Sequence, residues 1–558
     1  MSFLFPCFLL AQKKAETAFE VQGTVSLPGY DVSNRVIYFT WYKNGGHVTD
    51  SAVVKQNSFG FKNTGDVDVK AVLQFTKPGA ATNETADPNT LNFYLAKGMI
   101  TVVAKGYLRK ADVKGSALND EYFSFKKTFS KFDMPLRSLT RQMRNVKREN
   151  TDLRQTLKKR MDSIQNIKAI QLSEFLEKDI RKPYASEALL MYMNALSDAA
   201  DTSISQHFFD ELPAKQKLTA TGKEINRLLA ERKEPAFTMN ILQGLDFYDV
   251  YAQPVNAKMP PGITALSNTE VIRQLSDNEL ERIGKTLTVR LTLKSRCDNY
   301  DRIGNVLLVT MPKGEKFDRE KCEKFEMLRF ITPFMYCNRE PDHVPYEAVA
   351  DQLVNVIKQA DKDVYLMVAV GGTTGAGQAE VAGCNGSNIT FNISVDLVCG
   401  KVKTDDQQKA ITLLDNYSID NKDKTAGKNS KQVSFELPND TKTTTLYVIS
   451  SGHGAANGGE EYNWRTHVID IDGKEYTRLD MNQDCTPYEV YNTQPNGIYT
   501  GDMSKERRSW CPGGPVPIKV INLGPLPKGM HTLKISIPDA DFDKTDSKYY
   551  VSAYLILQ

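Results

Sequence analysis

The chain has 558 residues, of which 41% are hydrophobic and 25% are charged, and its formal net charge at pH 7 is +3. This length predicts about three to four domains, and the composition is that of ordinary globular proteins. A net charge so close to zero gives no overall argument for nucleic acid or for an acidic ligand. Outside the N-terminus no apolar run is long enough to cross a membrane, so we expect no stable membrane insertion.

An apolar run from Phe3 to Leu10 lies at the start of the chain and is followed by Lys13 and Lys14. Such a run resembles the apolar part of a secretory signal, although no basic residues precede it. An ordinary buried N-terminal segment is the alternative interpretation. We predict a signal-like segment over residues 1–20 and therefore a secreted or periplasmic protein.

Eight cysteines and six histidines bear on metal chemistry. No CxxC pair is present, which argues against a zinc ribbon, and the scattered histidines lack the HExxH pattern of a metal hydrolase. We therefore expect no metal and no cofactor. In an exported protein the cysteines after residue 290 favour disulfides, with one cysteine left over. These cysteines are Cys297, Cys322, Cys337, Cys384, Cys399, Cys485 and Cys511.

Residues 21–130 are predicted to form a small β domain, with β structure continuing to about residue 128. Val36–Tyr42 and Ala71–Phe75 are rich in β-branched and aromatic residues, and Ala96–Gly98 is a hairpin signal between two further strands. Three segments, Phe19–Thr24, Asp50–Val54 and Gly115–Tyr122, resemble the N-terminal β domain of exported redox proteins of Bacteroidetes-type bacteria. No CxxC motif follows, so the resemblance implies export rather than a redox activity.

Residues 131–235 are predicted to be helical. Apolar residues from Leu136 to Ile164 recur at intervals of three, four and seven, as on one face of a single long helix. Further helices are expected over about 183–200, 203–210 and 221–232. The span is rich in Arg and Lys but lacks the interleaved aromatic residues of a nucleic-acid platform. We interpret it as the solvated basic face of a packed helix and expect no nucleic-acid partner.

From residue 236 onward, short strands alternate with clusters of Gly, Asn, Asp and Pro. Regular short strands with turn signals are typical of β-sandwiches and jelly rolls. The polar run after Gly400 divides this half into two units, 236–400 and 401–558. The predicted fold class is therefore mainly β, with a small β domain and a helical segment before these two units.

Three polar clusters stand out in this half, at residues 297–302, 450–467 and 505–517. Each combines charged residues with an aromatic residue. Aromatic rings stack on the C–H faces of sugars and charged groups bond sugar hydroxyls, so this composition suits a carbohydrate site. Two carboxylates across a cleft can share the activation of a water and the protonation of a leaving group. Taken alone, any one cluster is more often a structured loop.

Four motifs follow one another between about residues 285 and 558. They are Cys297–Arg302 (CDNYDR), Leu328–Phe334 (LRFITPF), Glu461 with Trp464–His467 (WRTH), and Trp510–Gly513 (WCPG) with Val516–Pro517. Their order resembles that of the peptide-N-glycosidase F family. The resemblance implies two adjacent antiparallel jelly rolls with the active site between them. It also implies hydrolysis of the amide that joins Asn to the first GlcNAc of an N-glycan, which leaves Asp and needs no metal.

The resemblance also implies roles for individual residues. Asp301 matches the primary catalytic Asp, which acts on the nucleophilic water, and Glu461 matches the second essential carboxylate. Substrate contacts are implied for Arg302, Tyr300, Ile331, His453, Tyr462, Arg507 and Trp510. Because Arg302 follows Asp301 directly, we predict that it lowers the pKa of Asp301 and keeps this carboxylate ionised as a base. Glu461 is expected to bond the sugar or the glycosidic nitrogen, and to be protonated if Tyr462 or Trp464 buries it.

The sequence departs from the family pattern in its acids and its cysteines. The strand Val364–Val370 carries no acid where the family has a third one, and Glu380 is the candidate replacement. The Gly-rich run Gly371–Gly377 lacks the Lys-Ser/Thr of a phosphate loop and is interpreted as a β turn. Cys485 and Cys511 fit one family disulfide. Cys297 needs another partner, for which Cys322 and Cys337 are the candidates.

Three functions remain open from the sequence. The first is an N-glycan amidase, the second a non-catalytic N-glycan-binding protein, and the third an endoglycosidase that cuts between sugars. The presence of both essential carboxylates favours the amidase. The expected partners are N-glycosylated proteins and glycopeptides, and a monomer is expected. The resemblance to this family assigns no role to residues 21–235.

Overall fold

The computed structural model describes residues 17–26, 32–43, 46–75, 90–146, 150–196, 202–233, 237–255, 257–359, 361–374, 384, 386–400, 408–454, 459–494, 507–543 and 546–558. Residues 1–16, which hold most of the predicted signal-like segment, lie outside this part. The chain divides into two compact units, one holding the described residues up to Lys127 and the other those from Thr128 to Gln558. Of the described helices, none is both long enough and apolar enough to cross a membrane.

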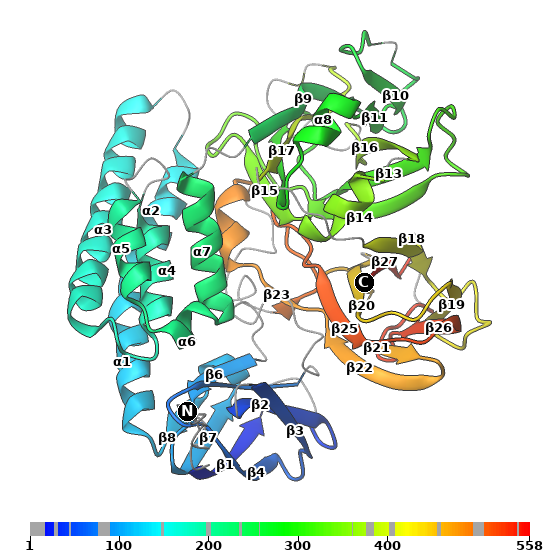
Figure 1. Ribbon diagram of the computed structural model, residues 1–558. Coiled ribbons are helices and arrows are strands. Elements are labelled where there is room, and N and C mark those ends of the chain that lie inside the picture. The colour runs from blue at the N-terminus through cyan, green and yellow to red at the C-terminus, as the bar shows by residue number, and fades with distance from the viewer. Residues whose placement is uncertain are drawn as a thin grey trace, which may run out of the picture. The chain divides into compact units, whose positions relative to one another are not determined.

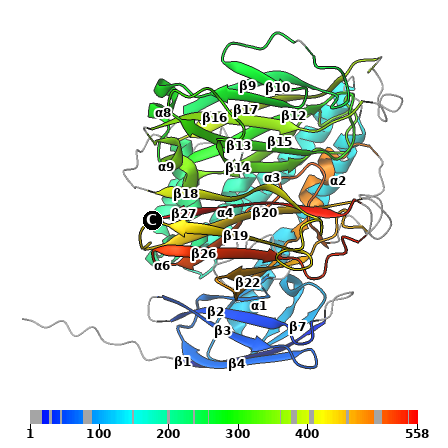
Figure 2. The same cartoon turned by 90° about the vertical axis from the view of Figure 1, so that its right-hand side faces the viewer.

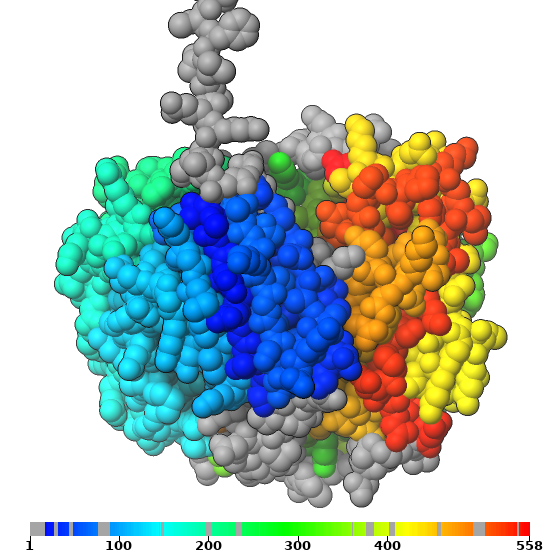
Figure 3. Space-filling model, turned by 90° about the horizontal axis from the view of Figure 1, so that it is seen from below, coloured from blue at the N-terminus to red at the C-terminus, as the bar shows by residue number. Residues whose placement is uncertain are grey.

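The N-terminal unit contains two four-stranded sheets, with the strand orders β4-β1-β7-β8 and β3-β2-β5-β6. Its elements are β1 (Thr17–Ser26), β2 (Val36–Lys43), β3 (Gly46–Val53), β4 (Ser58–Gly65), β5 (Lys70–Gln74), β6 (Thr90–Tyr94), β7 (Gly98–Lys105), the 3-10 helix η1 (Leu108–Lys110) and β8 (Asp112–Lys114). The rings of Phe39 and Trp41 stack at 5.1 Å in its core and are fully buried. Figures 1 and 3 show these strands in blue, and in the space-filling view they form a continuous surface.

The expectation that β structure continues to about residue 128 is wrong, because Ala117–Ser130 form the helix α1. Its buried aromatic residues Tyr122, Phe125 and Phe129 are separated by three and four positions, which is the spacing of one helical face.

Six helices with described bounds follow. They are α2 (Asp133–Asn145), α3 (Thr151–Asp179), α4 (Ala185–Ala195), α5 (Ser203–Glu211), α6 (Ala214–Lys217) and α7 (Ala220–Lys233). The apolar run from Leu136 to Ile164 was predicted to lie on one long helix, and this prediction is wrong. Val146 is extended after α2, and the Asn150 side chain caps α3 by accepting a hydrogen bond from the Leu153 amide at 3.2 Å. The apolar residues of the two helices then pack against each other instead of continuing along one helix.

The first C-terminal sandwich pairs a five-stranded sheet, β10-β11-β16-β13-β14, with a four-stranded sheet, β15-β12-β17-β9. Its strands are β9 (Phe237–Tyr248), β10 (Ile263–Ser267), β11 (Glu270–Gln274), β12 (Leu287–Ser295), β13 (Ile303–Pro312), β14 (Glu323–Ile331), β15 (Val344–Val349), β16 (Lys362–Val370) and β17 (Ile389–Cys399). The short helices α8 (Asp277–Arg282), η2 (Asp351–Leu353) and α9 (Val354–Ile357) lie between them in the chain. Apolar residues of both sheets form one core.

The second sandwich pairs the sheets β18-β27-β20-β25 and β19-β26-β21-β22. Its elements are β18 (Lys409–Ile419), β19 (Ser430–Leu437), β20 (Thr444–His453), β21 (Thr466–Ile471), β22 (Lys474–Asp480), β23 (Gln483–Asp484), η3 (Thr486–Tyr491), β24 (Arg507–Arg508), β25 (Lys519–Gly524), β26 (Gly529–Ser536) and β27 (Lys548–Leu557). All strand pairs in both sandwiches are antiparallel, and Figure 2 shows their strands stacked in layers. The predicted fold class, mainly β with two antiparallel jelly rolls, is confirmed.

A fully buried ion pair joins the two sandwiches. Arg329 of β14 donates to both carboxylate oxygens of Glu326 at 2.7 and 2.8 Å. The same guanidinium reaches the second sandwich, where it bonds Ser451 of β20 at 3.1 Å and the Tyr550 carbonyl of β27 at 2.6 Å. A buried charge that satisfies so many fixed partners tolerates little displacement, so this contact sets how the two sandwiches meet.

Candidate active site

The loop between β12 and β13 is organised by Asp298. This side chain is fully buried and accepts hydrogen bonds from the Tyr300 amide at 2.9 Å, the Thr373 amide at 2.7 Å and Arg302 Nε at 2.7 Å. Thr332 closes the other side of the loop, because its hydroxyl accepts from the Arg302 amide and donates to the Tyr300 carbonyl, both at 2.6 Å. Three polar contacts on one carboxylate fix the backbone from which Asp301 projects.

A disulfide between Cys297 and Cys384 holds the start of this loop. We expected Cys322 or Cys337 to pair with Cys297, and this expectation is wrong. Cys337 does pack against the bridge. The spacing along the chain could not distinguish these cysteines, since pairing depends on which loops the sheets bring together. The second disulfide, Cys485–Cys511, is as expected.

Asp301 lies where the two sandwiches meet and accepts a hydrogen bond from the Tyr462 hydroxyl through Oδ2. Burial raises the pKa of Asp301 from 3.8 to about 7. The Tyr462 hydrogen bond and the charge of Arg302 lower this pKa, whereas the charge of Glu461 raises it further. The prediction that Arg302 keeps the pKa of Asp301 low is wrong, because the guanidinium of Arg302 pairs with Asp298 and burial outweighs its remaining effect.

Glu461 is held by the end of β20. Its Oε2 accepts from the Gly454 amide at 2.6 Å, and its own amide donates to the Gly454 carbonyl at 3.1 Å. Its Oε1 lies 3.8 Å from Nδ1 of His453, and the Glu461 side chain is 23% exposed. One oxygen of Glu461 is therefore fixed by backbone, while the other faces His453 and the side chain as a whole is partly exposed.

Tyr462 connects the two carboxylates. It follows Glu461 and has a φ of +62°, a backbone conformation that residues other than glycine rarely adopt. Burial and the charge of Asp301 raise the pKa of Tyr462 well above its usual range, so the phenol stays neutral and donates. Its ring lies 4.4 Å from the Trp510 ring, and the Arg508 guanidinium lies 5.1 Å from its centroid.

Trp510 and Ile331 are fully buried beneath Tyr462 in one apolar cluster with Val516. Trp510 Nε1 donates to the Gly452 carbonyl at 2.6 Å, and its ring stacks on His453 at 5.2 Å. In this arrangement both residues support the site from below, and their expected direct contact with a substrate stays a prediction.

Tyr300 and Arg302 form a partly exposed surface beside Asp301. The Arg302 guanidinium lies 5.3 Å from the centre of the Tyr300 ring, and this ring meets Phe334 edge-on at 6.0 Å. The backbone of Arg507 belongs to β24, whereas its side chain lies outside the described part of the structure. Glu380 and residues 375–377 of the Gly-rich run also lie outside that part, and the predicted strand Val364–Val370 within β16 carries no acid.

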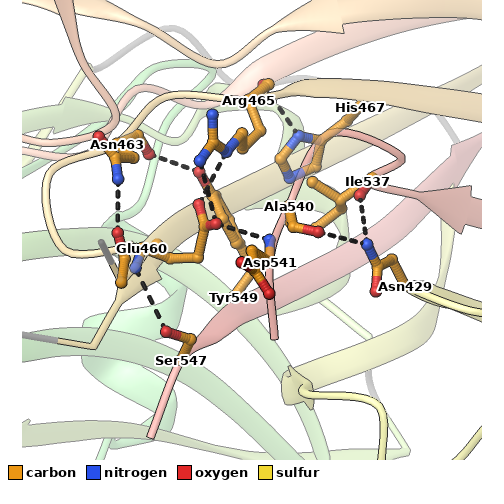
Figure 4. Close-up of polar contacts among 12 residues, drawn as sticks. Asn429, Glu460, Asn463, Arg465, His467, Ile537, Ala540, Asp541, Ser547 and Tyr549 are labelled. Atoms are coloured by element: carbon orange, nitrogen blue, oxygen red, sulfur yellow. Dashed lines mark hydrogen bonds and ion pairs between the residues drawn. The ribbon is translucent and has the colours of Figure 1, made fainter. Parts of the chain in front are cut away.

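The sequence reasoning missed Glu460, which anchors the loop that carries Glu461. The carboxylate of Glu460 is fully buried, pairs with Arg465 at 2.8 and 3.1 Å, and accepts from the Asp541 amide at 2.7 Å (Figure 4). Its amide donates to Ser547 at 3.3 Å. The sequence feature that could have indicated this role is the pair of adjacent acids, Glu460 and Glu461. The first anchors the backbone, and the second lies at the candidate site.

The comparisons with known proteins agree with this arrangement. Residues 247–379 match the family model "Peptide-N-glycosidase F, N terminal", and residues 421–556 match "Peptide-N-glycosidase F, C terminal". Residues 19–122 match a domain of unknown function, DUF4369. A search of curated proteins finds no match.

Solved structures with a similar chain path are also found. A structure of PNGF-II is 19% identical and covers 60% of this chain and 68% of its own, with a TM-score of 0.44. A recombinant peptide: N-glycanase F is 16% identical, covers 58% and 96% respectively, and has a TM-score of 0.41. PNGase F, a glycosylasparaginase from Flavobacterium meningosepticum, is 15% identical with the same coverage and a TM-score of 0.39. On its two matched regions, 247–379 and 421–556, this chain belongs to the peptide-N-glycosidase F family.

Proposed function

We propose that this protein hydrolyses the amide bond between asparagine and the innermost GlcNAc of N-glycans. The observation that carries the proposal is the convergence of Asp301 and Glu461 from two sandwiches. Tyr462 bonds the first of these carboxylates and adjoins the second in the chain. The charge of Glu461 also raises the pKa of Asp301, in agreement with this placement.

In the proposed reaction Asp301 is the general base. Its pKa of about 7 makes its ionised form a stronger base than an ordinary aspartate, while a large fraction remains ionised at neutral pH. Because Tyr462 occupies Oδ2, the other oxygen is left to accept a proton from water. The water oxygen attacks the amide carbon of the glycosylated Asn, the C–N bond breaks, and the proton held by Asp301 passes to the leaving nitrogen, so that Asp and a glycosylamine are formed. A second water then hydrolyses the glycosylamine to the free sugar and ammonia.

Glu461 is assigned to the sugar side of the bond. Its Oε1, the oxygen that the Gly454 amide does not bond, is assigned to the first GlcNAc or the glycosidic nitrogen. Tyr300, with Arg302 above it, offers an aromatic face for a sugar ring, and Arg507 completes the proposed substrate contacts. We assign Tyr462 to the positioning of Asp301, with Trp510 and Ile331 supporting its ring.

A non-catalytic N-glycan-binding protein is the second candidate. The observation that favours it is β16, whose segment Val364–Val370, which ends beside the Asp301 loop, carries no acid. Glycan release from a denatured glycoprotein separates the two functions directly, since a binding protein retains the glycan unchanged.

A defined glycopeptide tests the reaction. We expect the wild-type protein to leave an Asp, about one dalton heavier than Asn, and in water labelled with oxygen-18 one labelled oxygen enters this carboxylate. GlcNAc remaining on Asn would instead identify an endoglycosidase. The matched control is Asp301→Asn, which keeps the shape of the side chain and removes the base.

We further propose that the natural partners are N-glycosylated proteins and glycopeptides and that the protein acts as an exported monomer. The disulfides Cys297–Cys384 and Cys485–Cys511 support export, because such bonds persist in oxidising compartments.

A further inference from the structure

His453 lies between Glu461 and a buried serine. Its Nδ1 faces Oε1 of Glu461 at 3.8 Å, and its Nε2 lies 2.9 Å from the Ser451 hydroxyl. The imidazole is clamped between the Trp510 ring at 5.2 Å and the Tyr550 ring at 5.7 Å, and the His453 side chain is only 12% exposed. The ring therefore has a fixed orientation, in which each nitrogen has one defined neighbour.

The donors and acceptors around Ser451 decide which nitrogen of His453 carries the proton. Arg329 donates to the Ser451 oxygen at 3.1 Å, and a guanidinium has no acceptor to offer in return. The hydroxyl hydrogen of Ser451 then points to Nε2 of His453, which accepts it. A neutral imidazole that accepts at Nε2 carries its hydrogen on Nδ1, facing Glu461. The opposite tautomer would place a nitrogen lone pair against a carboxylate.

The charge state of His453 agrees with this assignment. Burial lowers the pKa of His453, and the positive charges of Arg329 and Lys548 lower it further, while Glu461 acts in the opposite direction. The net effect of burial and of these three charged residues is a neutral imidazole at neutral pH. A neutral ring keeps one N–H directed at Glu461 without neutralising the carboxylate.

The chain of contacts begins at the junction of the two sandwiches. Arg329 is fixed by Glu326 within the first sandwich, and also bonds Asn416 at 3.0 Å and Ser552 at 3.2 Å in the second. Ser451 thus receives a hydrogen bond from a guanidinium that cannot rotate. The orientation of the His453 proton consequently depends on the docking of one sandwich against the other.

We propose that His453 is a positioning residue for Glu461, held in its Nδ1–H tautomer by Ser451 and Arg329. This inference rests on the proposed function only where it concerns catalysis. It predicts that Glu461 adopts its working orientation only while the two sandwiches are docked through Arg329.

The tautomer can be read from the full chain labelled with nitrogen-15 in its histidine rings. The chain has six histidines, so the signals of His453 are assigned by comparison with His453→Gln. At neutral pH we expect wild-type His453 to show a protonated Nδ1 and a bare Nε2. A protonated Nε2 in the wild type would overturn the proposal, and this measurement needs no substrate.

Two neighbouring serines provide a matched pair of variants. Ser451→Ala removes the partner of His453, whereas Ser450→Ala removes an equally buried hydroxyl that bonds Nε2 of His467 at 2.8 Å. We expect Ser451→Ala to lose the Nδ1–H signature of His453 and to lower kcat roughly 10-fold with KM unchanged. Ser450→Ala should keep the Nδ1–H signature of His453 and the wild-type kcat. Equal loss of kcat in the two variants would overturn the proposal. A wild type with the expected tautomer that releases no glycan would contradict the amidase function and leave the assignment of His453 standing.

Discussion

The two loops that carry the carboxylates of the site are built alike. In the 297–302 loop the buried Asp298 pairs with Arg302 at 2.7 Å, and in the 460–467 loop the buried Glu460 pairs with Arg465 at 2.8 Å. Both acids also accept hydrogen bonds from backbone amides, and the Arg partners are similarly exposed, at 29% and 27%. Each loop thus contains one acid that shapes the backbone and a second acid that faces the site.

The loops differ in how they are held. Cys297–Cys384 closes the first loop covalently, whereas the second relies on the Asp541 amide and on a backbone with positive φ at Tyr462. Adjacency in sequence therefore does not identify the partner of a charged residue. Arg302 follows Asp301 but pairs with Asp298, four positions earlier, and this leaves Asp301 with a raised pKa.

The largest expected effect separates the two acids of the first loop. Asp301→Asn removes the proposed base, and we expect glycan release to fall by roughly 10²- to 10⁴-fold. Folding should be retained, and near pH 8 the variant should be at least as stable as the wild type, because a buried charge is removed. The sign follows from the raised pKa of Asp301, which means that ionisation opposes folding as pH rises from about 4 to 7. Near-normal release, measured by mass spectrometry, would contradict its role.

The next effect belongs to the buried acid of the same loop. Asp298→Asn leaves Arg302 without its carboxylate and weakens three hydrogen bonds, so we expect a loss of roughly 2–3 kcal/mol in the free energy of unfolding. The measurement is the urea dependence of unfolding, with Asp301→Asn as the control in the same loop. If Asp298→Asn were as stable as Asp301→Asn, the division into anchoring and working acids would be wrong.

A smaller loss is expected in the second loop. Glu460→Gln keeps an acceptor for the Asp541 amide but ends the ion pair with the partly exposed Arg465. We expect a decrease of roughly 1–2 kcal/mol in the free energy of unfolding, and Glu461→Gln serves as the control. A larger loss from Glu461→Gln than from Glu460→Gln would reverse the roles assigned to the two acids.

The effect of Tyr462→Phe is a displacement of the pH profile. Its hydroxyl lowers the pKa of Asp301, so its removal raises that pKa, and the acidic limb of kcat/KM moves to higher pH. Arg302→Gln should move the limb in the same direction and by less, since Arg302 is the weaker of the two influences. A limb that stays in place or moves to lower pH in Tyr462→Phe contradicts the assignment of Asp301 as the base.

The smallest effect is expected at an ion pair whose arginine is exposed. Arg141 of α2 donates to Glu489 of η3 at 3.0 Å, but the Arg141 side chain is 51% exposed. Arg141→Gln should change the free energy of unfolding by less than about 1 kcal/mol. A loss as large as that from Asp298→Asn would show that burial does not separate the strong pairs from the weak ones. Unfolding in urea measures this effect on the same scale as the two loop variants.

The mainly β class and the two jelly rolls could be predicted from the sequence, because the short strands between turn residues and the four motifs can be recognised in the chain itself. The periodicity of the apolar residues could not show that one helix ends before Val146 and another begins after Asn150, since the apolar spacing continues across this boundary. The roles of Asp298, Glu460 and Ser451 were missed for a related reason. Each also bonds a partner 75 or more positions away, namely Thr373, Asp541 and Arg329 respectively, which only the folded sheets bring near.

The central claim is most directly tested with one N-glycopeptide incubated with the wild-type protein and with Asp301→Asn in oxygen-18 water. The account predicts that the wild type leaves a glycan-free peptide with one labelled Asp carboxylate, while Asp301→Asn leaves the glycopeptide intact. A peptide that keeps GlcNAc on Asn, or equal release by the two proteins, would contradict it.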